Sequence, residues 1–188
     1  MTRLYRVTDT SNQHAMSILR RGLSTATVDQ KTLENYHPDY SNNNANLFYI
    51  LEHGRYAAGA YFFVCDDEDN FLASSGWHPY NETTALVSSR AYVAPLGAHQ
   101  YPIARFITPV AIREAWSFPE LWMCFNEHNY GFFKGFSRGK WENHPTYKYF
   151  EPAGEAVVNH THQWIVRVNK QRFEQDGLLN PDLSVSIR

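Results

Sequence analysis

Residues 84–104 read TALVSSRAYVAPLGAHQYPIA, and this stretch decides how the chain is expected to fold. A strand-like run, Thr84–Val93, stops at Pro95, and a short loop, Leu96–Tyr101, leads into a helical run that begins at Pro102. The first N–H groups of a helix have no partners within it, so they face the preceding loop and can hold an anion. The stretch therefore predicts a strand–loop–helix unit that binds a phosphate-bearing ligand.

Composition bounds the class of protein. The chain has 188 residues, enough for one domain with a sizeable core, and its 17 basic and 19 acidic residues form no basic block. We therefore do not expect nucleic acid as a partner. The first ten residues lack a signal-peptide pattern, and no apolar run approaches the roughly 18 residues of a membrane span. These patterns favour a cytoplasmic protein with no membrane partner, in which Cys65 and Cys124 are buried free thiols.

The N-terminal part of the chain is predicted to be mainly helical after one short strand. The expected strand is Leu4–Thr8, and Ser11 should cap the first helix, which has Ala15, Ile18 and Leu19 on its apolar face and should stop at Gly22. A second, short helix should begin with a capping box at Thr27 and Gln30 and is limited by Pro38. A third helix is expected at Ala45–His53, closed by Gly54.

Strands dominate the rest of the chain. The expected strands are Ala60–Cys65 and Phe71–Trp77, joined as a hairpin by the acidic turn Asp66–Asn70, then Thr84–Val93, Leu121–Phe125, Tyr147–Glu151 and His162–Val168. In Thr84–Val93 the odd positions are small or apolar and the even ones more polar. Helices are expected at Pro102–Trp116, where Pro109 should kink the helix or loosen one turn, and at Tyr130–Trp141. Sequential strands with helices set between them indicate an α+β or mixed α/β sheet.

This order of elements, together with motifs at Tyr92–Ala104 and Asn126–Phe136, resembles the GNAT superfamily of acyl-CoA-dependent N-acetyltransferases. Family members usually carry a strand ending in Val-x-Pro, followed by Arg/Gln-x-x-Gly-x-Gly/Ala at the start of a helix. Val93-Ala94-Pro95 matches the strand end, and His99–Ala104 is the aligned loop. Ala104 suits the last position, whereas Pro102 stands in place of the first glycine and His99 in place of Arg or Gln. Pro102 removes one backbone donor, although proline is well tolerated at a first helical position.

The resemblance implies a fold and a co-substrate. The implied fold is a single GNAT-like domain over residues 1–188, with residues 170–188 as a C-terminal tail. Its central, mostly antiparallel twisted sheet would have about six to seven strands and helices on both faces. The implied co-substrate is acetyl-CoA, with no metal. The residues implied to bind it are Tyr92, Val93, His99, Gln100, Tyr101, Pro102, Ile103, Ala104, Asn126 and Phe133.

The resemblance also implies catalytic positions. The family often has Asn after its fifth strand, where Asn126 stands, and a tyrosine about seven residues later that protonates the departing thiolate. That later position is Phe133, which cannot donate a proton. Tyr130, one helical turn earlier, is the substitute candidate, with a water or no acid as the alternatives. The N–H of Val93, where the family's strand diverges from its neighbour, would polarise the thioester carbonyl.

The implied reaction is direct transfer of an acetyl or other short acyl group to the amine of a small molecule or peptide. A base or a water relay must first take a proton from the amine, and the candidate bases are His78, Glu82, Glu127 and His128. Two alternatives stay open. One is a GNAT-fold protein that binds acyl-CoA or another ligand with little or no transfer. The other is a metal-dependent enzyme built around His160 and His162. A homodimer is also open, and the sequence does not identify the acceptor.

Overall fold

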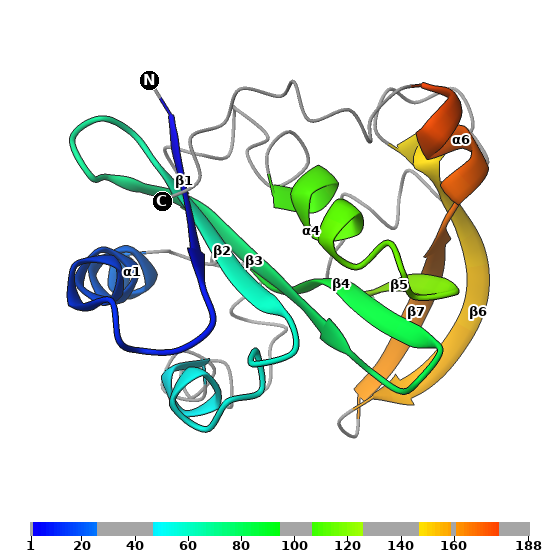
Figure 1. The fold of residues 1–188 in the computed structure, drawn as a ribbon, viewed down its shortest axis with the longest axis horizontal. Coiled ribbons are helices and arrows are strands. Elements are labelled where there is room, and N and C mark those ends of the chain that lie inside the picture. Colours follow the sequence, from blue (N-terminus) through cyan, green and yellow to red (C-terminus); the bar gives the residue numbers. More distant parts are fainter. Residues whose placement is uncertain (1, 26–46, 95–106, 126–146, 159–160, 177–188) are drawn as a thin grey trace.

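A seven-stranded sheet forms the centre of the computed structural model, which describes residues 2–25, 47–94, 107–125, 147–158 and 161–176 (Figure 1). The strand order is β1-β2-β3-β4-β5-β7-β6. Each neighbouring pair is antiparallel except β4 and β5, which are parallel. The strands are β1 (Arg3–Val7), β2 (Ala60–Cys65), β3 (Phe71–Pro79), β4 (Thr84–Val93), β5 (Glu120–Phe125), β6 (Phe150–Val158) and β7 (Thr161–Val168). The predicted α+β fold with a mostly antiparallel sheet is confirmed.

Helices cover both faces of the sheet. They are α1 (Gln13–Thr25), a helical segment at 47–52, α4 (Thr108–Glu114), the 3-10 turn η3 (Tyr147–Tyr149) and α6 (Lys170–Gln175). Figure 1 shows α1 and α4 on opposite sides of β2 and β3. The first core lies under α4 and α6 and includes Phe62, Ile112 and Phe173. The second core lies under α1 and segment 47–52 and includes Leu19 and Phe63.

Helix α1 begins and continues differently from the prediction. Its N-cap is Asn12 rather than Ser11, because the Asn12 Oδ1 atom accepts a hydrogen bond from the Ala15 N–H at 3.0 Å. Gly22 lies inside the helix and does not end it. A Cβ atom at Gly22 would lie 2.2 Å from the Cβ atom of Phe71, so this glycine serves the close approach of α1 to β3.

The middle of the chain follows the prediction closely. The hairpin β2–β3 and the strands β4 and β5 form where expected, and Gly54, with φ +75, closes segment 47–52. Helix α4 begins at Thr108, so Pro109 lies in its first turn, where a missing N–H costs no helical hydrogen bond. Ile107 is the N-cap residue of α4, and residues 102–106 lie outside the described ones, so the kink or loosened turn expected within the longer helix stays a prediction. The helix ends at Glu114, two residues before the predicted end. The expected short helix near Thr27 and the helix over 130–141 lie outside the described residues.

The C-terminal part differs most from the prediction. Residues 147–149 form η3, so strand β6 begins only at Phe150, and it runs on to Val158 rather than ending at 151. The pairing register of β6 shifts between Pro152 and Gly154, where φ is +121. These two residues suit an edge strand but hide its sequence pattern. Helix α6 occupies the start of the expected tail, and its Phe173 side chain is buried in the first core.

Candidate functional site

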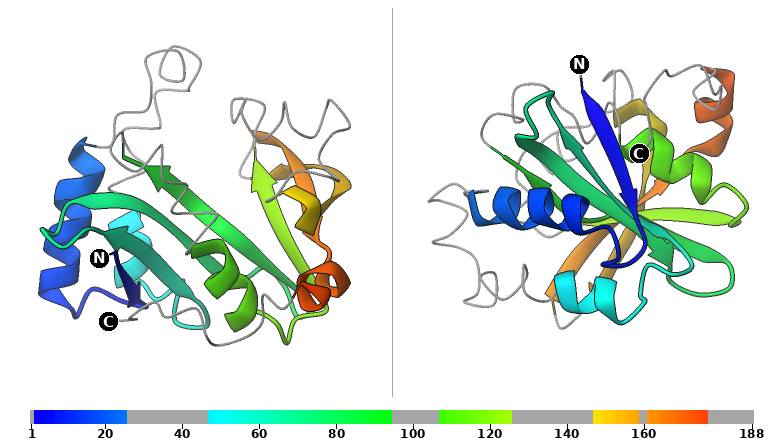
Figure 2. Two further views of the ribbon diagram at one scale, coloured as in Figure 1. Left: turned by 90° about the horizontal axis from the view of Figure 1, so that it is seen from above. Right: turned by 60° about the vertical axis from the view of Figure 1, so that its left-hand side comes forward.

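The main feature of the candidate site is the divergence of the two parallel strands at the centre of the sheet. Strand β4 pairs with β5 only at Thr84, Leu86 and the residue between them, and from Val87 onward the described residues show no further pairing between the two strands. The left view of Figure 2 shows the starts of β4 and β5 side by side and their C-terminal ends far apart. The backbone edges of β4 and β5 therefore face each other across a widening V.

The hydrogen-bond pattern fixes which backbone groups of β4 face this V. The N–H of Ala94 donates to the carbonyl oxygen of Leu72 at 2.8 Å. Val93 is the Cα partner of Ala73. Antiparallel partners alternate between hydrogen-bonded and non-hydrogen-bonded pairs, so the pair Ala73–Val93 is of the second kind. The N–H and C=O of Val93 are consequently directed away from β3, toward the side on which β5 has diverged.

Two bulges in β4 precede Val93. Leu86 pairs with His78, Ser89 with Gly76 and Tyr92 with Ser74, so each step of two residues on β3 is matched by a step of three on β4. Each step therefore inserts one extra residue into β4, and such insertions bend a strand and increase its twist.

These bulges break the simple alternation expected from the sequence. Ala85 and Val87, at apolar odd positions, are buried in the first core, but Ala91 is exposed and Tyr92 is buried in the second core. Sequence reasoning missed the bulges, and the available signal was the run Ser74-Ser75-Gly76 inside a central strand.

Few of the expected site residues lie in the described part of the chain. The Tyr92 side chain is buried in the second core, so its backbone is the part that can meet a ligand. The remaining expected binding and catalytic residues lie outside the described residues and stay predictions. They are His99, Gln100, Tyr101, Pro102, Ile103, Ala104, Asn126, Tyr130 and Phe133.

Two of the candidate bases lie at the wrong end of β4. His78 pairs with Leu86, and Glu82 lies in the turn that precedes β4. The β3 partners of Leu86 and Val93 are His78 and Ala73, which lie five residues apart, or roughly 17 Å at about 3.3 Å per strand residue. Neither side chain is therefore placed to take a proton from an amine that reacts beside the Val93 N–H. The other two candidate bases, Glu127 and His128, lie outside the described residues.

Both cysteines are free thiols, as predicted. Cys65 is buried as predicted, whereas Cys124 is only half-buried. Burial raises the pKa of each thiol to about 11, which keeps both neutral near pH 7. A neutral thiol is a poor nucleophile, so the packing role expected for Cys124 agrees with its surroundings.

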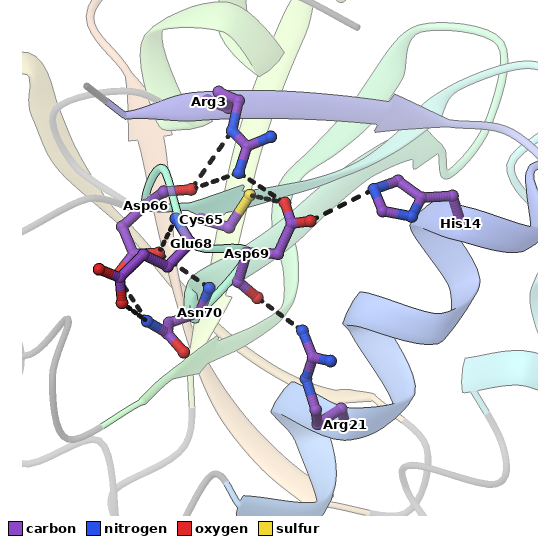
Figure 3. A network of polar contacts seen from close by, with 8 residues as sticks. All are labelled: Arg3, His14, Arg21, Cys65, Asp66, Glu68, Asp69 and Asn70. Carbon is purple, nitrogen blue, oxygen red and sulfur yellow. Dashed lines mark hydrogen bonds and ion pairs between the residues drawn. The ribbon is translucent and has the colours of Figure 1, made fainter.

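The acidic turn between β2 and β3 is held by cations from its own chain (Figure 3). Asp69 accepts a hydrogen bond from Arg3 at 2.6 Å and lies 3.4 Å from the His14 Nε2 atom. Asp66 accepts from the N–H groups of Glu68 and Asn70. Although burial alone would raise the pKa of Asp66, hydrogen bonds from the Asn70 side chain and from the N–H groups of Asn70 and Glu68 lower it. The turn thus ties β1 and α1 to the hairpin, and the Arg3 guanidinium offsets part of its negative charge.

The histidines considered for a metal give no cluster in the part of the chain that is described. His162 lies 2.7 Å from the Glu155 carboxylate across the β6–β7 hairpin, while His160 falls outside the described residues. Within the described ranges, no group of three or more His, Cys, Asp or Glu side chains could hold a metal ion. Among the same residues, no helix is long and apolar enough to cross a membrane.

Known proteins resemble this chain in structure and not in sequence. No protein-family model and no curated protein matches it. An acetyltransferase of the GNAT family from Staphylococcus aureus Mu50 superposes with a TM-score of 0.57 at 10% identity, over 88% of this chain and 99% of that one. The chain has the GNAT fold. An N-acetyltransferase from the same organism gives a TM-score of 0.56 at 12% identity, over 89% and 97% of the two chains.

A variant of spermidine N-acetyltransferase from Vibrio cholerae is similar to the same extent. Its TM-score is 0.53 at 10% identity, over 93% of this chain and 98% of that one. The resemblance read from the motifs is therefore confirmed for the fold. At such low identity the likeness carries no information about the acceptor.

Proposed function

We propose that this protein is an acyltransferase that moves an acetyl or other short acyl group from acyl-CoA to an amine by direct transfer. The observation that carries the proposal is the orientation of the Val93 N–H, which the β3–β4 pairing directs toward the diverging edge of β5. A backbone donor held in this way can hydrogen-bond to a thioester carbonyl and to the oxyanion that forms when an amine attacks it. The GNAT fold supports acyl-CoA as the donor.

The other expected site residues would act on acyl-CoA bound beside the Val93 N–H. The diphosphate of the coenzyme would bind the N–H groups of Gln100, Tyr101, Ile103 and Ala104, ahead of α4. The amine must be neutral to attack, and the departing thiolate then takes a proton, for which Tyr130 is the candidate donor. Asn126, the residue that follows β5 in the sequence, and Phe133 complete the expected site.

The first test is binding and turnover. Acetyl-CoA at about a hundred times its dissociation constant should stabilise the folded chain by roughly 2.7 kcal/mol and raise its melting temperature. Thiol release from acetyl-CoA should then depend on an added amine. The amine panel should range from small molecules to peptides, because the acceptor is not identified. Stabilisation without thiol release from any amine would instead support the second candidate, an acyl-CoA-binding protein, which the replacement of tyrosine by Phe133 favours.

A proline substitution tests the backbone donor itself. The Val93 N–H faces away from β3, so Val93→Pro removes it without breaking a β3–β4 hydrogen bond. Removal of one oxyanion donor typically costs about 10²- to 10³-fold in kcat, and a loss of that size is expected here. Ala94→Pro is the matched control, because it breaks the bond to Leu72 and should lower the melting temperature more. Unchanged turnover in Val93→Pro would rule out the assigned role of this N–H.

A further inference from the structure

We infer that Gly76 is a positioning residue that fixes the two bulges of β4 and thereby the direction of the Val93 N–H. The inference rests on the proposed function for its chemical consequence, and on the packing around β3 for its structural content. Gly76 pairs with Ser89 at the point between the two bulges, with a register shift on either side of it. It is therefore the residue of β3 against which the bent part of β4 is aligned.

No side chain fits at this position. A Cβ atom at Gly76 would lie 2.8 Å from Tyr56 Cε1, 2.8 Å from Tyr61 Cδ2 and 2.9 Å from the Ala60 carbonyl oxygen. All three distances are shorter than real Cβ contacts, so the backbone or the rings would have to move. The glycine is thus required by the close approach of two tyrosine rings to β3.

The surroundings of Gly76 leave little room for the rings to yield. Tyr56 and Tyr61 are fully buried, with their ring centroids 5.4 Å apart. The Tyr61 hydroxyl donates to the Ser74 Oγ atom at 2.9 Å, and Ser74 is fully buried as well. Tyr56 also packs edge-on against His78, with a centroid distance of 5.8 Å. A side chain at position 76 would therefore displace the β3 backbone rather than the rings.

A displaced β3 changes the pairing of β4 beyond Ser89. The direction of each N–H in β4 depends on whether its residue occupies a hydrogen-bonded or a non-hydrogen-bonded pair. If one of the two extra residues were lost from the bulges, Val93 would slip by one position and its N–H would turn toward β3. The geometry points to Gly76 as the residue that prevents this slip.

The test combines a register measurement with kinetics on Gly76→Ala. In the wild type, the non-hydrogen-bonded pair should give a strong Hα–Hα nuclear Overhauser effect between Ala73 and Val93. In Gly76→Ala this signal should be lost, kcat for acetyl transfer should fall at least tenfold, and the Kd for coenzyme A should change less than about threefold. Gly154→Ala is the matched control: it forces alanine to φ +121 on the edge strand β6, so it perturbs the fold away from β4.

Two results would overturn the inference. One is a retained Ala73–Val93 signal in folded Gly76→Ala. The other is a fall in kcat of Gly76→Ala that is no larger than the fall in kcat of Gly154→Ala, when each variant is assayed the same number of degrees below its own melting temperature. If Gly76→Ala does not fold, Gly76→Ala/Tyr56→Leu removes one of the two crowding rings. It is judged by the same criteria, because Tyr61 Cδ2 and the Ala60 carbonyl oxygen still lie 2.8 Å and 2.9 Å from the added Cβ atom. If the wild type turns over no amine, the proposed function fails, while the register measurement still decides the role of Gly76.

Discussion

Glu114, the last residue of α4, provides a sharp test of how the helix is held on the sheet. Its carboxylate accepts hydrogen bonds from Arg6 Nε at 2.7 Å, from Arg6 Nη2 at 3.1 Å and from the indole N–H of Trp77 at 2.9 Å. Arg6 lies on β1 and Trp77 on β3, so one side chain connects three elements. The perturbation is the pair of variants Glu114→Ala and Glu114→Gln.

The two variants should differ in size of effect. The Trp77 side chain is buried in the first core, so truncation at position 114 takes the acceptor from a buried indole N–H, which costs about 1–3 kcal/mol. The ion pair with Arg6 is more than one-quarter exposed on both sides and adds only about 0–1 kcal/mol. Glu114→Ala should therefore lower the free energy of unfolding by about 2–3 kcal/mol. Glutamine keeps an oxygen for Trp77, so Glu114→Gln should cost less than about 1 kcal/mol.

Urea unfolding measures both values, provided that the dependence on denaturant stays the same among the variants. Trp77→Phe is the control, because it removes the indole donor but keeps an aromatic ring in the core. Combined with Glu114→Ala it should cost less than the sum of the single changes. An effect of Glu114→Ala below about 0.5 kcal/mol, or equal effects for alanine and glutamine, would refute the assignment of the main contribution to the buried indole.

Three further predictions follow from the described contacts. Because burial raises the pKa of Cys124 to about 11, its thiol should react with a disulfide reagent at pH 7 far more slowly in the folded chain than in urea; equal rates would contradict this. Hydrogen bonds from Lys148 and Tyr149 lower the pKa of Asp176, so its contribution to stability is present above the ordinary carboxyl pKa and is lost as the pH falls through the folded value. Melting temperatures of the wild type and Asp176→Asn should accordingly differ at pH 6 and converge as the pH falls below the ordinary carboxyl pKa, and a constant difference would refute the linkage. Ser74→Ala and Tyr61→Phe remove the two partners of one buried hydrogen bond, so each should lower the free energy of unfolding by about 1 kcal/mol. In urea unfolding, the double variant should show a coupling energy of similar size between the two changes, whereas additive effects would show that the hydrogen bond contributes nothing to stability.

The sequence predicted the strands of the middle region because their patterns are unambiguous. β2 is apolar on both faces, as a central strand must be, and the acidic turn at Asp66–Asn70 marks the hairpin. In these segments the local sequence pattern and the tertiary packing favour the same structure, so the pattern alone is enough to predict the strands.

The failures occur where packing with distant residues decides. Gly22 looks like a helix stop, but it lies inside α1 because Phe71, on a strand far along the chain, needs the space of its missing side chain. Strand β6 was predicted too short because Pro152 and Gly154 interrupt its pattern at a bulge. The bulges of β4 have the same character, since the tyrosines that crowd Gly76 come from outside β3 and β4. For the candidate site, the sequence indicated the position of Val93, but it did not indicate the bulges that orient its N–H group.

The divergence of β4 from β5 is compatible with a stable sheet because each strand has another full partner. β4 pairs with β3 from Ala85 to Val93, and β5 pairs with β7 from Trp122 to Phe125. The opening of the V therefore removes pairing only along the facing edges of β4 and β5. Those edges consist of backbone N–H and C=O groups, which are costly to leave without partners when a site excludes water. A ligand with amide and carbonyl groups of its own can complete them, which an extended thioester arm would do and a compact apolar ligand would not.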